Sequence, residues 1–401
     1  MGISATSDSA TSDDTLDPHD LYHPTLNELY ARIEKTKQLK TYLSIVSALS
    51  FISAIPAFYF SPLTSCGLTV IGIASLIYTT ILKKTPPYLI LAIDGGGIRG
   101  IIPAQLLSLI EKEVGRPIGE LFDCIAGTSI GGILALALAQ ENPRRSAVEA
   151  CHFLEHHGAT IFERTQAERV QSLDGLRAPK YSNQNLSHAV EEAFQSSMLH
   201  DSITDLVITS YDLSSGKPMI FSTFRGQKTS SYKMQDVALA TSAAPVYFPS
   251  YPLNNLNLVD GGLVANNPSL LALIQAKKAI DPRRDIFILS LGTGERALKS
   301  IPASQSMRYG MIQWVPLLFD LIFNSMHAVQ LQGLKHIQET SSTAISFLRL
   351  QPELLTKEQE LLDNGSSKNI RDLKKIATTH FHKHHAQINK EIIEPLKKYR
   401  A

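Results

Sequence analysis

The chain has 401 residues, 44% of them hydrophobic and 19% charged, so it can bury a sizeable core. A net charge of +1 excludes a strong electrostatic attraction to nucleic acid, and no nucleic-acid partner is expected. Three cysteines form no disulfide framework, and neither C-x-x-C nor H-E-x-x-H occurs, so no metal is expected.

Residues 1–24 are rich in Ser, Thr and Asp, and we expect a disordered tail there. The first six residues, MGISAT, also fit the M-G-x-x-x-[ST] pattern of N-myristoylation, which would modify Gly2. Thr25 and Glu28 then have the spacing of a capping box, and apolar residues recur behind them at helical intervals. A short amphipathic helix is therefore expected as the first element.

A stretch without charged residues follows, from residue 41 to residue 82. It contains two apolar segments, at about residues 42–60 and 66–82, each close to the length that spans a hydrocarbon core about 30 Å thick. Lysines flank the pair on both outer sides and are absent from the connection, which predicts that both ends face the cytoplasm. Residues 25–84 are thus expected to hold a two-segment membrane anchor. A buried core hairpin or a re-entrant wedge is the alternative.

A Pro-Pro pair at residues 86–87 marks a boundary, and the next domain is expected over residues 88–350. Apolar runs of strand length occur at residues 88–93, 206–211 and 286–291. A helical pattern spans residues 101–114, and residues 219–222 form the expected hairpin partner of the second strand. This alternation predicts an α/β fold with a mainly parallel sheet between helices.

Two later segments complete the expected organisation. Residues 311–326 are unusually apolar and predict either a core helix or a lipid-facing wall near the mouth of a site. Residues 351–401 are charged and are expected to form a helical C-terminal region.

The first chemical motif is CIAGTSIGG at residues 124–132, which has the form G-x-S-x-G. Small residues such as Gly127 and Gly131 allow a strand to turn sharply into a helix, with Ser129 presented at the apex. The serine is then a candidate nucleophile. A glycine-rich strand–helix turn with an incidental serine is the alternative.

The second motif is DGGGIRG at residues 94–100, which comes between an expected strand and an expected helix. It fits the G-x-G-x-x-G dinucleotide fingerprint, but the second strand and acidic residue that should follow about 20 residues later are not recognisable. Consecutive glycine N–H groups at a helix N-terminus also suit an oxyanion hole. We favour this use, with Arg99 orienting the loop or meeting an anionic headgroup.

A serine nucleophile requires a base, and no histidine of this chain stands out for that role. Asp260 does stand out, because it ends an apolar run and is followed by Gly261 and Gly262. A sheltered aspartate within hydrogen-bond distance can accept the serine proton, although its ordinary pKa is near 4. An ordinary Asp-Gly turn is the alternative for this motif alone.

Together the three motifs, in this order, resemble the patatin-like phospholipases, and residues 241–248 and 266–268 also resemble stretches of that family. The resemblance covers residues 88–294, about half the chain. It implies a Ser–Asp dyad without histidine, with Ser129 as nucleophile and Asp260 as base. The oxyanion hole is implied at Gly95, Gly96, Gly97 and Arg99, within a motif that begins at Asp94 and ends at Gly100.

The expected function is a membrane-anchored lipid acyl hydrolase with its catalytic domain facing the cytoplasm. It would cleave a phospholipid or other acyl-lipid through an acyl-enzyme on Ser129, without a metal or organic cofactor. Two alternatives remain open: an acyltransferase or transacylase that uses the same dyad, and a non-catalytic membrane scaffold that keeps the fold.

Overall fold

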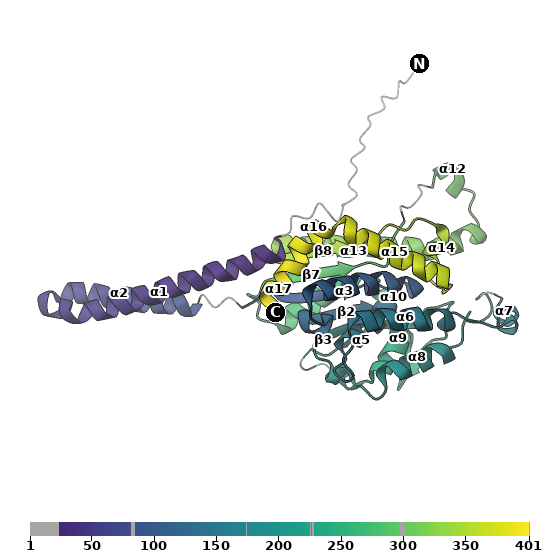
Figure 1. Ribbon diagram of the computed structural model, residues 1–401, viewed down its shortest axis with the longest axis horizontal. Coiled ribbons are helices and arrows are strands. Elements are labelled where there is room, and N and C mark those ends of the chain that lie inside the picture. The colour runs from purple at the N-terminus through teal and green to yellow at the C-terminus, as the bar shows by residue number, and fades with distance from the viewer. Residues whose placement is uncertain are drawn as a thin grey trace, which may run out of the picture.

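The computed structural model describes residues 24–81, 85–173, 175–224, 226, 228–296 and 301–400. The expected disordered tail, and Gly2 with it, lies outside the described residues apart from Pro24. A central eight-stranded sheet organises the molecule, with helices on both of its faces (Figure 1). The predicted α/β class is therefore confirmed.

The sheet has the strand order β5-β6-β3-β2-β1-β7-β8, with β4 paired to β3. Strands β1, β2, β3, β7 and β8 are parallel to one another, while β4 and β6 run antiparallel to β3. The strand bounds are Tyr88–Ile93 (β1), Cys124–Thr128 (β2), Asp205–Asp212 (β3), Lys217–Ser222 (β4), Tyr251–Leu253 (β5), Leu256–Asp260 (β6), Ile286–Leu291 (β7) and Ile345–Leu350 (β8).

Successive residues of β1 face opposite sides of the sheet and enter two hydrophobic cores. Leu89 and Leu91 pack into the larger core, and Ile90 into the smaller one. The larger core lies beneath α3 (Ile101–Val114), α5 (Ile130–Ala139), α6 (Ala147–Ile161), α8 (Gln184–Phe194), α9 (Met234–Ser242) and α15 (Ser367–Lys383). The smaller core lies beneath α11 (Ser269–Ala279) and α13 (Met311–Thr340).

The remaining helices of the domain have seven residues or fewer. They are η1 (Gly97–Gly100), α4 (Ile118–Leu121), α7 (Gln166–Ser172), η2 (Leu199–Asp201), η3 (Lys228–Ser231), α10 (Gly262–Ala265), α12 (Ala303–Ser306), α14 (Lys357–Glu360), α16 (His385–Ile388), η4 (Asn389–Ile393) and α17 (Glu394–Arg400). The C-terminal region that begins near residue 351 is helical, and its α15 and α17 contribute buried residues to the larger core.

The first helix, α1 (Leu26–Phe60), begins inside the domain and leaves it. Its capping box is confirmed: the Thr25 N–H donates to Glu28 Oε2 at 2.9 Å, and the Glu28 N–H donates to Thr25 Oγ1 at 3.2 Å. Leu26 and Leu29 are fully buried in the larger core, and Tyr30 stacks on Tyr399 with ring centroids 3.7 Å apart. These contacts fix the direction in which the rest of α1 projects.

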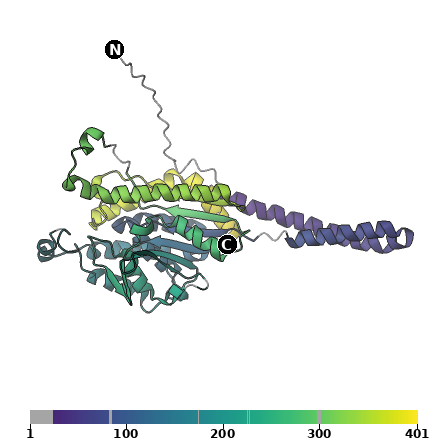
Figure 2. The same ribbon diagram turned by 180° about the vertical axis from the view of Figure 1, so that it is seen from behind.

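Helix α2 (Pro62–Ile81) returns along α1, and the pair projects away from the domain (Figures 1 and 2). Hydrogen bonds join the two helices, from Ser47 Oγ to the Gly72 carbonyl at 3.0 Å and from Ser75 Oγ to the Leu43 carbonyl at 2.6 Å. The expected separate amphipathic helix is instead continuous with the first apolar segment.

Across the part of the chain that the structure describes, no helix combines the length and the apolar character needed to cross a membrane. The prediction of two transmembrane helices is therefore not supported.

Candidate active site

Ser129 lies at the turn between β2 and α5, where a strand passes directly into a helix. Its backbone has φ 55° and ψ −124°, a conformation that residues with a side chain rarely adopt. Neighbouring glycines permit the turn: a side-chain carbon on Gly127 would collide with the Gly131 carbonyl, and one on Gly131 would collide with the Ile93 carbonyl. The G-x-S-x-G motif thus forms a tight elbow that presents Ser129.

Pairing with β3 places Asp260 beside the elbow that carries Ser129. In β3, Thr209 pairs with Thr128, the last residue of β2. The next residue, Ser210, pairs with Asp260, the last residue of the antiparallel strand β6. Strand β2 pairs with residues 205–209 of β3, and the antiparallel β6 pairs with residues 210–212. The final residues of β2 and β6 therefore meet at the position of the elbow.

The Ser129 hydroxyl donates to Asp260 Oδ2 at 2.5 Å, and the Gly262 N–H donates to Asp260 Oδ1 at 2.6 Å. Asp260 is buried, and burial raises its pKa to about 6, although the two hydrogen bonds oppose this shift. In the described chain, Asp260 is the side chain that bonds the Ser129 hydroxyl, and no histidine does so. The pair can therefore transfer a proton directly from serine to aspartate.

Three threonines hold the elbow in place through hydrogen bonds. The Ser129 N–H donates to Thr241 Oγ1 at 2.9 Å, and the Thr241 hydroxyl donates to the Thr209 carbonyl at 2.7 Å. Thr128 Oγ1 lies 2.7 Å from Thr209 Oγ1 and donates to the Ala265 carbonyl at 2.7 Å. The supporting roles of these threonines were not predicted, because a buried threonine in a strand has no distinctive sequence signal.

The glycine loop at residues 94–100 lies beside the elbow, since a side-chain carbon on Gly95 would be 3.3 Å from Ser129 Cβ. Two of its N–H groups are already engaged: that of Gly95 donates to the Asn266 carbonyl at 3.1 Å, and that of Arg99 donates to the Gly96 carbonyl at 3.1 Å. The N–H groups of Gly96 and Gly97 have no acceptor among the described residues. Among the four residues that the resemblance implies, Gly96 and Gly97 thus have available N–H donors, and the oxyanion hole itself stays a prediction.

Gly97 has φ 55°, and a side-chain carbon there would collide with the Leu362 carbonyl. The same carbonyl accepts the Ile98 N–H at 2.9 Å, so the loop is held against the segment that follows α14. Gly100 closes the motif against α5, because a side-chain carbon there would lie 2.5 Å from Ile130. The loop has no space for larger residues at these positions.

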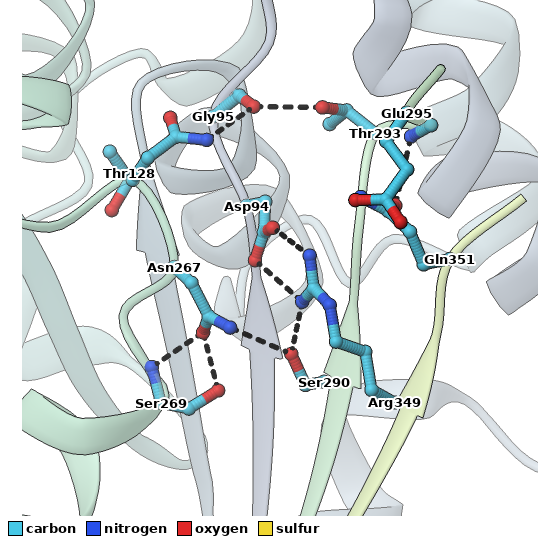
Figure 3. A network of polar contacts seen from close by, with 12 residues as sticks. Asp94, Gly95, Thr128, Asn267, Ser269, Ser290, Thr293, Glu295, Arg349 and Gln351 are labelled. Atoms are coloured by element: carbon cyan, nitrogen blue, oxygen red, sulfur yellow. Dashed lines mark hydrogen bonds and ion pairs between the residues drawn. The ribbon is translucent and has the colours of Figure 1, made fainter. Parts of the chain in front are cut away.

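Asp94, the first residue of the loop, forms a buried ion pair with Arg349 of β8 (Figure 3). Arg349 Nη2 lies 2.6 Å from Asp94 Oδ2, both side chains are 5% exposed, and Arg349 Nη1 donates to Ser290 Oγ at 2.7 Å. Burial raises the pKa of Asp94, and the paired guanidinium acts in the opposite direction. The network ties the loop to β7 and β8. Arg349 was not predicted, because it lies outside every motif.

Helix α13 also contacts the site, at the loop that follows Asp260. A side-chain carbon on Gly262 would be 3.3 Å from the Phe323 ring, which places the middle of α13 against the loop that follows Asp260. One turn further along α13, burial and then the charge of Arg349 lower the pKa of His327 to about 3. His327 is therefore neutral at physiological pH. Gly261, like Gly262, is confined, since a side-chain carbon there would collide with Thr209.

Fold and site together define a mixed α/β protein with a serine–aspartate pair at the carboxyl edge of its parallel strands. Residues 91–273 match the family model described as patatin-like phospholipase. A relative named cGAMP-activated phospholipase, from Pseudomonas aeruginosa, is 34% identical over 61% of this chain and 73% of its own length. The chain belongs to the patatin-like phospholipase family.

Plant proteins match over a longer stretch at lower identity. Patatin-like protein 1 of Oryza sativa subsp. indica is 28% identical over 71% of this chain and 78% of its own length. A Solanum tuberosum protein named probable inactive patatin-3-Kuras 1 is 29% identical over 70% of this chain and 83% of its own length.

Proposed function

We propose that the protein is a lipid acyl hydrolase of the phospholipase A or lysophospholipase type. The observation that carries the proposal is the 2.5 Å hydrogen bond from the Ser129 hydroxyl to the buried carboxylate of Asp260. A carboxylate with a pKa of about 6 is ionised at neutral pH and is a better proton acceptor than an ordinary aspartate. It therefore suits the role of general base for the serine.

In the first step the Ser129 oxygen attacks the carbonyl carbon of an ester, and its proton passes to Asp260. The negative charge that develops on the carbonyl oxygen is stabilised by the N–H groups of Gly96 and Gly97. When the ester C–O bond breaks, the leaving alcohol takes the proton from Asp260, and the acyl group stays on Ser129. Arg99 and the start of η1 add positive charge on this side of the site.

In the second step a water molecule attacks the acyl-enzyme and gives a proton to Asp260. The same two N–H groups hold the second oxyanion. Collapse of this intermediate breaks the bond to Ser129 Oγ, which recovers its proton from Asp260 as a fatty acid leaves. The scheme uses no group beyond the ester, water and this chain's own residues.

We further propose that α1 and α2 hold the protein at a membrane, with the catalytic domain on the cytoplasmic side. Apolar side chains on both helices are exposed, in contrast to those of the domain core. Examples are Tyr42 (65%), Ile45 (54%), Leu49 (58%), Ile52 (66%), Val70 (59%) and Ile71 (51%). Burying them in lipid stabilises the bound state by about 25 cal/mol for each Å² removed from water.

The activity is tested with full-length protein and vesicles of phosphatidylcholine labelled in one acyl chain. Wild type is expected to release labelled fatty acid, and Ser129→Ala to be at least about 1000-fold slower, because the nucleophile is lost. Ser196→Ala, at an exposed position outside the site, is the matched control and should equal wild type. Equal rates for Ser129→Ala and wild type would overturn the proposal, and transfer of label to an added lysolipid would identify a transacylase instead.

A further inference from the structure

The hairpin and the active site lie at opposite edges of the sheet. The start of α1 is fixed at the edge formed by the amino ends of the parallel strands, which we call the amino edge. There Tyr30 stacks on Tyr399, and Arg400 pairs at 2.5 Å with Asp123, the residue directly before β2. Ser129 follows the carboxyl end of β2. The six residues of β1 alone separate the two edges by about 20 Å.

The hairpin also points away from the active site. Figures 1 and 2 show α1 and α2 projecting from the amino edge, while α7 and α12 lie at the far end of the domain. At 1.5 Å per residue, the 35 residues of α1 span about 50 Å, most of it beyond the domain. A flat bilayer that takes up the hairpin from its tip would therefore meet the amino edge first, with Ser129 on the far side of the domain.

The carboxyl edge has exposed apolar side chains of its own, in two groups that we call the apolar rim. One group lies in the first half of α13 and just before it, and the other lies at α7 and after it. The rim consists of Met307 (86% exposed), Met311 (81%), Trp314 (37%) and Leu318 (46%), together with Val170 (75%), Leu173 (53%) and Leu176 (87%).

Both groups connect to the catalytic aspartate. The α13 group continues along the helix to Phe323, whose ring packs against Gly262 beside Asp260. The α7 group is linked through Val246, because a side-chain carbon on Gly175 would lie 2.7 Å from Val246 and the Lys180 N–H donates to the Val246 carbonyl. Three residues before Val246, the Ala243 carbonyl accepts the Asp260 N–H at 3.0 Å. Both groups of the rim therefore belong to segments that also contact the surroundings of Asp260.

Resting on the proposed hydrolase function, we propose that the apolar rim docks on a lipid surface distinct from the bilayer that holds the hairpin. Docking would let an acyl chain leave that surface and reach Ser129 along α13. For the α13 group the charge pattern favours lipid as the occupant, because between residues 301 and 326 the chain has two charged residues, Arg308 and Asp320. The base of the hairpin differs, with Arg32, Lys35, Lys37 and Lys40 suited to the headgroups of its own membrane.

The test uses full-length protein reconstituted in one set of vesicles, with the catalytic domain outside. These vesicles contain phosphatidylcholine with one acyl label, and separate target vesicles contain phosphatidylcholine with a second label. The proposal predicts release of the second label at least tenfold faster than the first. Release of the first label alone, or faster than the second, would overturn it.

Rim variants give the second arm of the test. Met311→Glu combined with Leu176→Glu adds charge at two exposed positions and should lower hydrolysis of target-vesicle lipid at least tenfold. Val329→Glu is the matched control, because Val329 is 66% exposed and lies on α13 outside the rim; its rate should stay within twofold of wild type. A rim variant that hydrolyses vesicle lipid as fast as wild type would overturn the proposal. The rim would then not dock on lipid, and a protein partner would be the alternative occupant.

A soluble short-chain nitrophenyl ester separates this proposal from the hydrolase function. Wild type and the rim variant should hydrolyse the soluble ester within twofold of each other, since the dyad is unchanged. If wild type does not exceed Ser129→Ala on this ester, the hydrolase function itself fails. If both wild type and the rim variant cleave the ester but wild type leaves target-vesicle lipid intact, only the docking proposal fails.

Discussion

The carboxylate of Asp260 accepts a 2.5 Å hydrogen bond from the hydroxyl of Ser129 across 131 residues of sequence. Strand β3 makes this contact possible by pairing with the end of β2 through Thr209 and with the end of β6 through Ser210. The sheet therefore places both side chains of the pair. In the proposed mechanism, the proton transfer from Ser129 to Asp260 then needs no loop closure.

The pH dependence of the reaction should follow Asp260. Its pKa is raised to about 6 by burial, and only the carboxylate can accept the serine proton. We expect kcat/KM to fall about tenfold for each pH unit below 6 and to be level above 7. A pH–rate profile with the soluble ester measures this, and a profile that stays level down to pH 4.5 would contradict Asp260 as the base.

The free energy of unfolding should change with pH in the opposite direction to kcat/KM. Because the folded-state pKa of Asp260 lies above its unfolded value near 3.9, the wild type loses stability as pH rises from about 4 to 6. Asp260→Asn has no such titration and should be about 1–3 kcal/mol more stable than wild type at pH 7.5, with the difference vanishing near pH 4.

Denaturant unfolding at both pH values measures this difference. Ser129→Ala provides the contrast, since it removes a hydrogen bond that favours the Asp260 carboxylate and should destabilise the protein at pH 7.5. An Asp260→Asn variant that is less stable than wild type at pH 7.5 would argue against a destabilising effect of burying the Asp260 carboxylate.

Replacing Arg349 should damage both the fold and the site. Arg349→Met leaves the buried Asp94 carboxylate unpaired, which typically costs about 3–5 kcal/mol. Arg349→Lys keeps the charge but cannot bond Asp94 and Ser290 in the same geometry, so we expect intermediate stability and a lower kcat. Urea unfolding and ester kinetics measure both effects.

The matched control is Arg296→Met. Arg296 pairs with Glu360 at 2.9 Å, but the two side chains are 28% and 39% exposed. This variant should lose less than about 1 kcal/mol. Equal losses for Arg296→Met and Arg349→Met would show that the buried pair has no special importance for the loop.

Gly97→Ala should displace an oxyanion donor. Gly97 has φ 55° and faces the Leu362 carbonyl, so a methyl group must move the loop. We expect kcat to fall by at least about 100-fold. Gly115→Ala is the control, because Gly115 has φ 80° but nothing within 4 Å of an added carbon. It should lose about 1 kcal/mol of stability and keep its activity, and comparable kcat values for the two variants would contradict the donor role.

Charges on the hairpin should weaken vesicle binding without affecting the dyad. Ile45→Glu combined with Ile52→Glu places two carboxylates at positions that are 54% and 66% exposed, where the proposal puts lipid. In flotation with phosphatidylcholine vesicles, we expect at least a tenfold loss of bound protein and unchanged hydrolysis of the soluble ester. Binding equal to that of wild type would contradict a role of the hairpin in membrane attachment.

Much of the fold could be predicted where the chain is uniformly buried. The runs at residues 88–93 and 286–291 and the helix at 101–114 have the expected bounds, because central parallel strands are apolar on both faces. Strand β8 was not predicted, since Arg349 interrupts its apolar pattern. The continuation of α13 to Thr340 was also missed, because its second half is polar on the exposed side.

The residues of the candidate site likewise include some that the sequence could predict and some that it could not. Ser129 and Asp260 could be selected because glycines mark the tight turns around both. The engagement of the Gly95 N–H by Asn266 could not be predicted, because it depends on the tertiary position of a distant loop. The Asp94–Arg349 pair and the packing of Phe323 against Gly262 likewise depend on how β8 and α13 lie in the folded chain.

Identification of the reactive serine tests the central claim most directly. An alkyl fluorophosphonate, which esterifies activated serines, is mixed with full-length protein, and the modified peptide is located by mass spectrometry. We predict one adduct, on Ser129, that is absent from Ser129→Ala and forms at least 100-fold more slowly in Asp260→Asn. An adduct on another residue, no adduct, or an unchanged rate in Asp260→Asn would contradict a Ser129 nucleophile activated by Asp260.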